Sequence, residues 1–181
     1  STLQCRVFSS VSLTPKIDRR SFSRRSFVLQ AGAMAEKHIL VVGAGQMGAG
    51  IAQVSLTAGF QVTLVDVSAD ALAKGLGIVE KGLAKLVEKG KLDEAGRAAV
   101  LSKLATASAI SDVKNVDVGI EAVTENEELK KKIFRDFDSV VKASGILATN
   151  TSSIPITRIA AVTKRPESVI GMHFMNPVPV M

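Results

Sequence analysis

The stretch over residues 37–66 limits the possible folds of this chain more than any other. KHILVV (37–42) is a short, largely β-branched run, typical of a buried strand, and GAGQMGAG follows it directly. AGIAQVSLTAG (49–59) has the spacing of a helix, and FQVTLVD (60–66) predicts a second strand. A strand, a glycine-rich turn, a helix and a strand within about 30 residues form a right-handed βαβ unit. This unit requires a parallel sheet.

The rest of the chain continues the alternation. Helical patterns are predicted at 69–91, 93–104, 126–141 and 156–162, and strands at 116–123, 145–150 and 169–174. The first two of these helices are expected to form a hairpin arm beside the sheet. The stripe that predicts the buried face of the helix at 126–141 consists of Leu129, Ile133, Phe137 and Val140. The predicted fold class is α/β, a Rossmann-type doubly wound, mostly parallel sheet with a helical hairpin arm.

The net charge of +6 originates in the first 35 residues. Residues 1–35 hold six basic residues and one acid, so 17 of the 23 basic and 16 of the 17 acidic residues lie in 36–181. Because that part is nearly neutral, no nucleic-acid-binding surface is expected. No apolar run reaches the roughly 18 residues that cross a bilayer, so no membrane span is expected. The single cysteine, Cys5, excludes a disulfide framework and a cysteine-based zinc site, and no metal site is predicted.

The first 35 residues are rich in Ser and Arg and poor in acids, which is typical of a mitochondrial or chloroplast transit peptide. A disordered basic tail, or sequence that precedes a true start at Met34, is the alternative interpretation. We therefore expect a leader at 1–35 and one folded domain at 36–181. The location would be organellar if the leader is a transit peptide, and otherwise the peroxisome or the cytosol. Since the chain begins with Ser, we expect it to be incomplete at both ends.

The glycine-rich turn predicts dinucleotide binding because it has the required context between a strand and a helix. In Gly43-x-Gly45-x-x-Gly48, the first glycine permits the tight turn, the second lets the backbone approach a pyrophosphate, and the third lets the helix pack on the strand. A turn selected only for packing is the alternative. The predicted cofactor-binding residues of the turn are Gly43, Ala44, Gly45, Gln46, Met47 and Gly48.

Asp66 is the last residue of the second predicted strand, 23 residues after Gly43. A carboxylate at this place can accept hydrogen bonds from the hydroxyls of the adenosine ribose and would repel a 2′-phosphate. No arginine follows to neutralise such a phosphate, so NAD is predicted over NADP. The alternative is that Asp66 caps the next helix, although Ser68 is better placed to do so.

His173 lies at the end of the last predicted strand and Asn176 follows it, at the sheet edge where ligands bind in doubly wound folds. Hydride transfer from an alcohol carbon needs a base for the hydroxyl proton, and histidine titrates in the right range. A histidine with a purely structural role is the alternative. His38 precedes the first strand at the opposite edge and is expected to be solvated. In NTSS (150–153), the hydroxyls could bind a substrate oxygen or cap the next helix, and the residues alone leave both open.

Four segments together resemble the 3-hydroxyacyl-CoA dehydrogenases, most closely the single-function 3-hydroxybutyryl-CoA dehydrogenases. These segments are VVGAGQMGAGIAQ, EAVTEN with KKKIF, ILATNTSSI and TKRPESVIGMHFMNPVPVM. The resemblance runs from Lys37 to Met181. It implies NAD-dependent oxidation of (S)-3-hydroxyacyl-CoA, as in the β-oxidation of fatty acids, or the reverse reaction.

The resemblance also implies roles for single residues. His173 would be the base, Ser152 would hydrogen-bond the same substrate hydroxyl, and Asn176 would order the site. The further implied contacts are Glu125, Lys130 and Ser152 with NAD, and Lys89 and Ser152 with coenzyme A. Chance charges at a helix start are the alternative for Glu125 and Lys130. Gly82 stands where some members have a serine that contacts coenzyme A.

In this family a glutamate pairs with the histidine at a position beyond Met181, and a helical C-terminal domain forms a homodimer. Both are expected outside this chain, so the chain by itself is expected to bind NAD without turnover. A 3-hydroxyacid dehydrogenase of the 6-phosphogluconate type is one alternative, but such enzymes use a lysine as base and lack the HFxNP segment. An NAD-binding module without turnover is the other alternative.

Overall fold

The computed structural model describes residues 36–181, and the predictions made for residues 1–35 lie outside the described residues. Six strands form one sheet, in which every strand pair is parallel. The strands are β1 (His38–Val42), β2 (Gln61–Val65), β3 (Leu104–Ala107), β4 (Val116–Glu121), β5 (Val141–Thr149) and β6 (Val169–Gly171). Their order across the sheet is β3-β2-β1-β4-β5-β6. This order confirms the predicted doubly wound α/β class.

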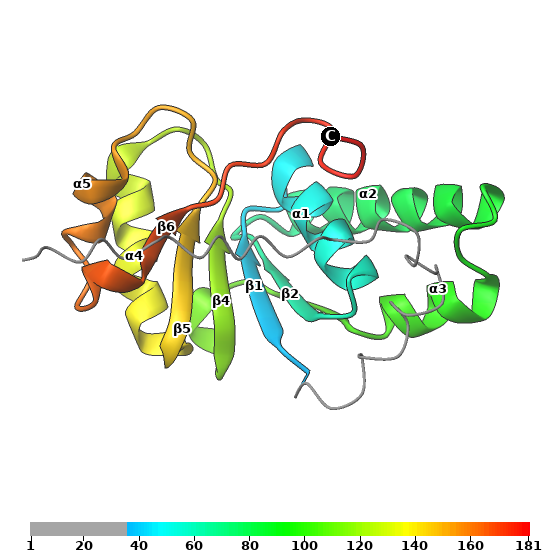
Figure 1. The fold of residues 1–181 in the computed structure, drawn as a ribbon, viewed down its shortest axis with the longest axis horizontal. Helices are drawn as coiled ribbons and strands as arrows, with labels where there is room; N and C mark the ends of the chain where they lie inside the picture. Colours follow the sequence, from blue (N-terminus) through cyan, green and yellow to red (C-terminus); the bar gives the residue numbers. More distant parts are fainter. Residues whose placement is uncertain (1–35) are drawn as a thin grey trace, which may run out of the picture. The chain divides into compact units, whose positions relative to one another are not determined.

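Helices cover both faces of this sheet (Figure 1). The α-helices are α1 (Gln46–Thr57), α2 (Ala69–Glu88), α3 (Glu94–Leu101), α4 (Glu127–Val140) and α5 (Ile156–Ala160), and two short 3-10 helices lie at Ile110–Asp112 and Pro166–Ser168. Within residues 36–181, no helix combines the length and the apolarity needed to cross a bilayer.

Alternate residues of β1 divide the core into two layers. Ile39 and Val41 pack with α1 and α2 on one face. Leu40 and Val42 pack with α4 and α5 on the other face. Successive side chains of a strand point to opposite faces, so a strand covered by helices on both sides must be apolar at every position. This requirement explains the continuous apolar run at the start of the domain.

Three predictions about the elements need correction. The strand β3 was missed, because the predicted helix 93–104 ends at Leu101 and Leu104 already belongs to the sheet. The first helix begins at Gln46, directly after the glycine turn, rather than at Ala49. Leu129 was placed on the buried stripe of α4, but it is 40% exposed, and Lys130 and Phe134 are buried in addition to Ile133.

The chain reverses its direction of winding between β1 and β4. From β1 it proceeds outward to β2 and β3, and then it crosses to β4 on the other side of β1. The helices that leave β1 and β4 therefore lie on opposite faces of the sheet, α1 on one and α4 on the other. Ligands of doubly wound folds bind beyond the carboxyl ends of the strands at such a reversal. The polar residues predicted for the site follow these strand ends.

Candidate active site

The glycine turn between β1 and α1 is packed so tightly that Gly43 and Gly48 leave no room for a side chain. Gly43 has a φ of +105°, and a Cβ built on it would lie 2.6 Å from the backbone oxygen of Ala122. A Cβ on Gly48 would lie 1.7 Å from the oxygen of Gly43, so α1 touches the turn directly. Gly45 has open space at the same position and is the N-cap of α1 without a side-chain cap. Backbone N–H groups of the first helical turn can therefore bind an anion.

Asp66 lies against this turn at the end of β2. Its Oδ2 accepts a hydrogen bond from the Ala44 N–H at 2.9 Å, and its Oδ1 accepts one from the Ser68 N–H at 3.0 Å. Ser68 caps α2, since its hydroxyl accepts from the Ala71 N–H at 3.2 Å, as the sequence indicated. The carboxylate thus lies next to the expected ribose position. Its contact with the ribose stays a prediction.

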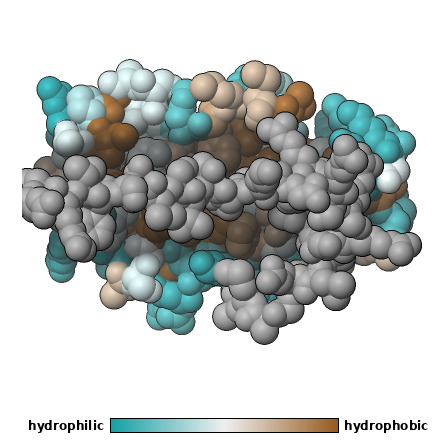
Figure 2. All heavy atoms as spheres, in the orientation of Figure 1, coloured by the Kyte–Doolittle hydropathy of each residue, from teal (hydrophilic) through white to brown (hydrophobic). Residues whose placement is uncertain are grey.

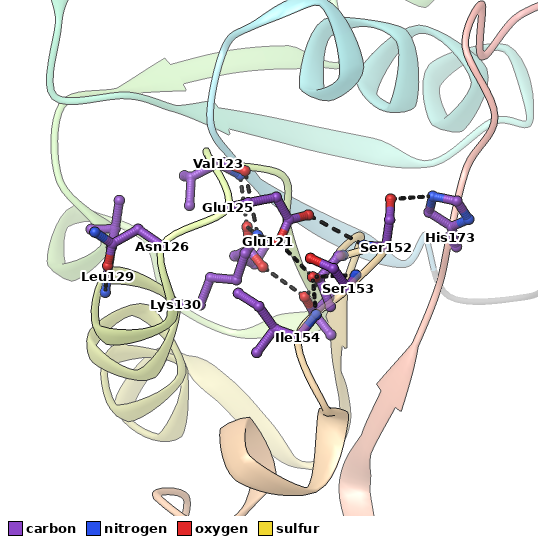
Figure 3. Close-up of polar contacts among 12 residues, drawn as sticks. Glu121, Val123, Glu125, Asn126, Leu129, Lys130, Ser152, Ser153, Ile154 and His173 are labelled. Carbon is purple, nitrogen blue, oxygen red and sulfur yellow. Dashed lines mark hydrogen bonds and ion pairs between the residues drawn. The ribbon is translucent and has the colours of Figure 1, made fainter.

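The structure brings His173 and Ser152 together. Ser152 follows β5, His173 follows β6, and the serine Oγ lies 2.9 Å from Nε2 of the histidine (Figure 3). β5 and β6 are neighbouring parallel strands, so the loops after both strands leave the same edge of the sheet. This geometry favours a functional role for the Ser152 hydroxyl, the question that the residues alone left open.

Two backbone N–H groups donate hydrogen bonds that fix the segment that carries His173. The N–H of Met172 donates to the oxygen of Thr149 at 2.9 Å. The N–H of Phe174 donates to Oδ1 of Asn150 at 2.7 Å. Asn150 was missed as a site residue, although its position at a strand end, two residues before Ser152, was a usable signal. Asn150 links the loop after β5 to the segment after β6 that carries His173.

Asn176 contacts the glycine turn rather than the histidine. Its Oδ1 accepts a hydrogen bond from Nε2 of Gln46 at 3.2 Å. The segment after His173 then runs over the N-terminal part of α1 (Figure 1), where Val178 is buried. A Cβ on Gly50 would lie 2.9 Å from Cβ of Val178, so the glycine permits this contact. The predicted ordering role of Asn176 therefore has a physical basis in its contact with Gln46.

Glu125 holds the loop of Ser152 from the side of β4. Its Oε2 accepts from the Thr151 hydroxyl at 2.6 Å, and its Oε1 accepts from the Ser152 N–H at 3.2 Å (Figure 3). Burial opposes ionisation of this carboxyl, but the two hydrogen bonds and the charge of Lys130 outweigh it and lower the pKa of Glu125. Glu125 is therefore a carboxylate at neutral pH, oriented toward the loop.

Lys130 is buried beside Glu125 on α4. Its Nζ lies 2.7 Å from Oε1 of Glu121, 3.3 Å from the oxygen of Val123 and 4.0 Å from Oε2 of Glu125. The side chains of Lys130 and Glu121 are only 1% and 0% exposed. Lys130 is therefore part of a buried ion pair and not a solvated charge at the helix start. Its predicted contact with NAD stays a prediction. Glu121 was missed, and its signal was a carboxylate directly after the apolar residues Val118–Ile120 at the end of a predicted buried strand.

The comparisons with known proteins agree with this geometry. A family model described as 3-hydroxyacyl-CoA dehydrogenase, NAD binding domain, matches residues 38–181. The chain belongs to the 3-hydroxyacyl-CoA dehydrogenase family. The match to its NAD binding domain confirms NAD as the predicted cofactor.

Relatives in this family include 3-hydroxybutyryl-CoA dehydrogenases. The probable 3-hydroxybutyryl-CoA dehydrogenase of Bacillus subtilis is 48% identical over 82% of this chain and 52% of its own length. The 3-hydroxybutyryl-CoA dehydrogenase of Bradyrhizobium diazoefficiens is 48% identical over 80% of this chain and 50% of its own. The crystal structure of the (S)-3-hydroxybutyryl-CoA dehydrogenase of Ralstonia eutropha has a TM-score of 0.76 and 46% identity, over 81% of this chain and 52% of that chain. The chain thus spans about half the length of these relatives.

Of the coenzyme A contacts implied by the family resemblance, Ser152 follows β5 and Lys89 lies at the end of α2. Lys89 is exposed directly after this helix, whose far end is hydrophilic at the right of Figure 2. Gly82 touches the buried amide of Gln53, because a Cβ on the glycine would lie 2.0 Å from Oε1 of the glutamine. A serine at this position would therefore displace Gln53. Lys89 stays a predicted contact with coenzyme A.

His38 is not the solvated residue that the sequence suggested. It lies at the opposite edge of the sheet, as expected, but it is half-buried, and its Nε2 lies 2.8 Å from the hydroxyl of Thr63. Burial lowers the pKa of His38, although the carboxylate of Asp117 acts in the opposite direction. In residues 36–181 there is no group of three His, Cys, Asp or Glu side chains that could hold a metal ion.

Proposed function

We propose that the protein containing this chain oxidises (S)-3-hydroxyacyl-CoA with NAD, or catalyses the reverse reduction of 3-oxoacyl-CoA. The observation that carries the proposal is the 2.9 Å contact of Ser152 and His173 at the sheet edge that also presents the glycine turn. A base, a hydroxyl donor and a dinucleotide cradle are the parts that alcohol oxidation needs. The relatives named 3-hydroxybutyryl-CoA dehydrogenase support the substrate class.

The residues of the glycine turn fit a dinucleotide. Gly45 leaves the space that a phosphate group would occupy, and the start of α1 offers N–H groups toward that space. Asp66 supplies a carboxylate that favours the ribose hydroxyls of NAD over the 2′-phosphate of NADP. When bound, NAD supplies the acceptor for the hydride from C3 of the substrate.

His173 takes the proton of the 3-hydroxyl in the oxidation. Its Nε2 faces the Ser152 hydroxyl, so a substrate hydroxyl that reaches this nitrogen also lies within reach of the serine. Ser152 can donate a hydrogen bond to the substrate oxygen and thereby hold C3 in line with the cofactor. In the reduction, His173 returns the proton to the oxygen of the 3-oxo group. General-base assistance of this kind contributes about 10²–10⁴-fold to the rate.

Substrate preference provides the test. The full-length protein should oxidise (S)-3-hydroxybutyryl-CoA with NAD, and NADH formation is followed at its absorbance maximum. Free (S)-3-hydroxybutyrate should react much more slowly, because it lacks the coenzyme A that Lys89 is proposed to bind. Preference for the free acid would favour the 6-phosphogluconate type. Tight NADH binding without turnover of either compound would favour a binding module.

We also propose that the full-length protein is a homodimer. The support is the resemblance to dehydrogenases that pair through a C-terminal helical domain. Light scattering on the purified full-length protein should give twice the mass of one chain, and a monomeric mass would contradict the proposal.

An organellar location is proposed from the leader at residues 1–35. Its composition, rich in Ser and Arg and poor in acids, supports a transit peptide. A fusion of residues 1–35 to a fluorescent reporter should enter mitochondria or plastids. Diffuse cytosolic fluorescence would instead favour translation from Met34, or an address elsewhere in the protein.

A further inference from the structure

Glu121 is a fully buried carboxylate at the end of the central strand β4, and the proposed chemistry does not use it. Its Oε1 accepts from the Val123 N–H at 2.7 Å and from Nζ of Lys130 at 2.7 Å. Its Oε2 accepts from the hydroxyl of Thr149 at 2.7 Å. Both oxygens are therefore bonded within the protein, and neither is directed at solvent (Figure 3).

These bonds fasten the loop beside the glycine turn. Val123 follows Ala122, whose N–H donates to the oxygen of Val42 at 2.8 Å. The oxygen of Ala122 lies so close to Gly43 that a Cβ there would approach it to 2.6 Å. Glu121 thus sets the position of Ala122 and Val123, against which the glycine turn packs.

The same residue fastens the loop that carries Ser152. The Thr149 hydroxyl, which donates to Glu121, also accepts from the Thr151 N–H at 3.2 Å. The main-chain oxygen of Glu121 accepts from the Asn150 N–H at 2.9 Å. One residue on β4 therefore holds the loop after β5 by two routes. The loop after β4 and the loop after β5 are both anchored to it.

Stability alone does not explain a buried ion pair at this place. Removing a carboxylate and an ammonium from water costs several kcal/mol per ion, and apolar replacements of such pairs are often neutral or stabilising. Glu121 and Lys130 are buried nevertheless, between two loops that carry the predicted site. The directional hydrogen bonds of a carboxylate fix loop positions more narrowly than an apolar contact does.

We propose that Glu121 is a positioning residue, which sets the distance between the glycine turn and the Ser152–His173 pair. This inference rests on the proposed dehydrogenase function. Glu121 itself touches neither substrate nor cofactor in this assignment. It acts through Thr149 on one loop and through Val123 on the other. A shift of about 1 Å between reacting groups can reduce a rate by about 100-fold.

The first test replaces Thr149 by valine in the full-length protein. This change keeps the shape and removes the single side-chain bond between Glu121 and the Ser152 loop. The matched control is Thr63→Val, because Thr63 is also a buried strand threonine, and its hydroxyl contacts His38 at the opposite sheet edge. Both variants should have lower melting temperatures. Only Thr149→Val should lower kcat, by about tenfold or more, with the Kd for NADH within about threefold.

A second variant acts on the carboxylate directly. Glu121→Gln keeps the side-chain length but removes the charge that faces Lys130. It should lower kcat at least as much as Thr149→Val does. If the uncompensated lysine prevents folding, the comparison of Thr149→Val with Thr63→Val still decides the question. Equal kcat values for those two threonine variants would overturn the proposal.

A readout independent of activity separates this inference from the proposed function. Amide hydrogen exchange and chemical shifts of Ser152 and Phe174 report on the two loops, and neither amide is bonded to Thr149. Thr149→Val should accelerate exchange at both amides, and Thr63→Val should not. If the parent protein has no dehydrogenase activity, the proposed function fails, and these amides still show whether Glu121 positions the loops. Unchanged amides in Thr149→Val would overturn the positioning role.

Discussion

The hydroxyl oxygen of Ser152 lies 2.9 Å from Nε2 of His173, although the two residues are 21 positions apart. Each of them follows a different parallel strand, and the pairing of Thr149 with Gly171 aligns the two strand ends. The contact therefore depends on strand register. A shift of one residue along β5 or β6 would move the two side chains apart by about 3.3 Å, the rise per residue of a strand.

Replacing His173 by glutamine should reduce kcat of the full-length protein by about 100-fold or more. The change removes the proton acceptor, and general-base assistance is worth about 10²–10⁴-fold. The Kd for NADH should be nearly unchanged, because the predicted dinucleotide contacts lie mainly on Gly43–Gly48 and Asp66. Steady-state kinetics and NADH fluorescence measure the two quantities. His38→Gln at the opposite edge is the matched control, and near-normal kcat in His173→Gln would remove this histidine from the mechanism.

Ser152→Ala should reduce kcat by about tenfold or more, since the substrate hydroxyl loses a hydrogen-bond donor beside His173. Bonds to charged or developing-charge groups are worth about 1.5–3 kcal/mol, which corresponds to such a factor. Ser153→Ala is the control, because this neighbouring serine is also exposed and lies in the same loop. Turnover with (S)-3-hydroxybutyryl-CoA is the measurement. An equal loss of kcat in both variants would indicate that the substitutions disturb the loop, and not that the Ser152 hydroxyl has a role of its own.

Asp66→Asn should narrow the preference for NADH over NADPH. Asparagine retains an oxygen that can accept from the Ala44 N–H but lacks the charge that would repel a 2′-phosphate. Titration of each cofactor by intrinsic cofactor fluorescence gives the ratio of the two Kd values. Asp70→Asn removes an equal charge from the first turn of α2 and should leave the ratio unchanged. Equal affinity for the two cofactors in the unaltered protein would contradict the assignment.

Gly48→Ala should destabilise the domain by about 1–3 kcal/mol, the usual range for overpacking, and should weaken NADH binding. The added methyl group would lie 1.7 Å from the oxygen of Gly43, so α1 and the turn must separate. Gly77→Ala on α2 is the matched control, because its added methyl group meets no atom within 4 Å. It should stabilise the helix by up to about 1 kcal/mol. Urea unfolding measures the free energy of unfolding of both variants. Similar values for Gly48→Ala and Gly77→Ala would contradict the prediction.

His38 should make stability depend on pH below neutrality. Burial lowers its pKa in the folded state, so the folded protein favours the neutral ring. This contribution is complete above the unfolded pKa, about 6.5, and is lost as the pH falls through the lower folded pKa. Melting temperatures at pH 7.5 and pH 5.5 should therefore differ more in the unaltered protein than in His38→Gln. The same difference in both proteins would show that groups other than His38 cause the dependence.

Most of the fold could be predicted from local patterns. Apolar runs, helical spacing and the glycine turn located β1, β2, β4, β5 and the main helices, because burial on both faces requires continuous apolar strands. β3 was missed for a physical reason. LATA (104–107) is a four-residue edge strand with no fully buried position, so it resembles the end of a helix. Its place in the sheet depends on pairing with β2, which no local pattern encodes.

The sequence by itself determined which residue types stand at the strand ends. It placed Gly43, Asp66, Ser152 and His173 after parallel strands, and parallel strands end at one edge of a sheet. The family resemblance then implied their roles. These inferences required only the order of elements along the chain.

The tertiary structure alone decided which of these groups touch. The bond of Asp66 to Ala44, that of Gln46 to Asn176 and the burial of Lys130 beside Glu121 depend on register, helix rotation and side-chain packing. A single sequence carries no local signal for such contacts, because each is made between residues from different elements. The same reason explains why Glu121 was missed, since in the sequence it is one of two carboxylates in the strand VDVGIE. In the folded protein, it is the point to which two loops of the site are anchored.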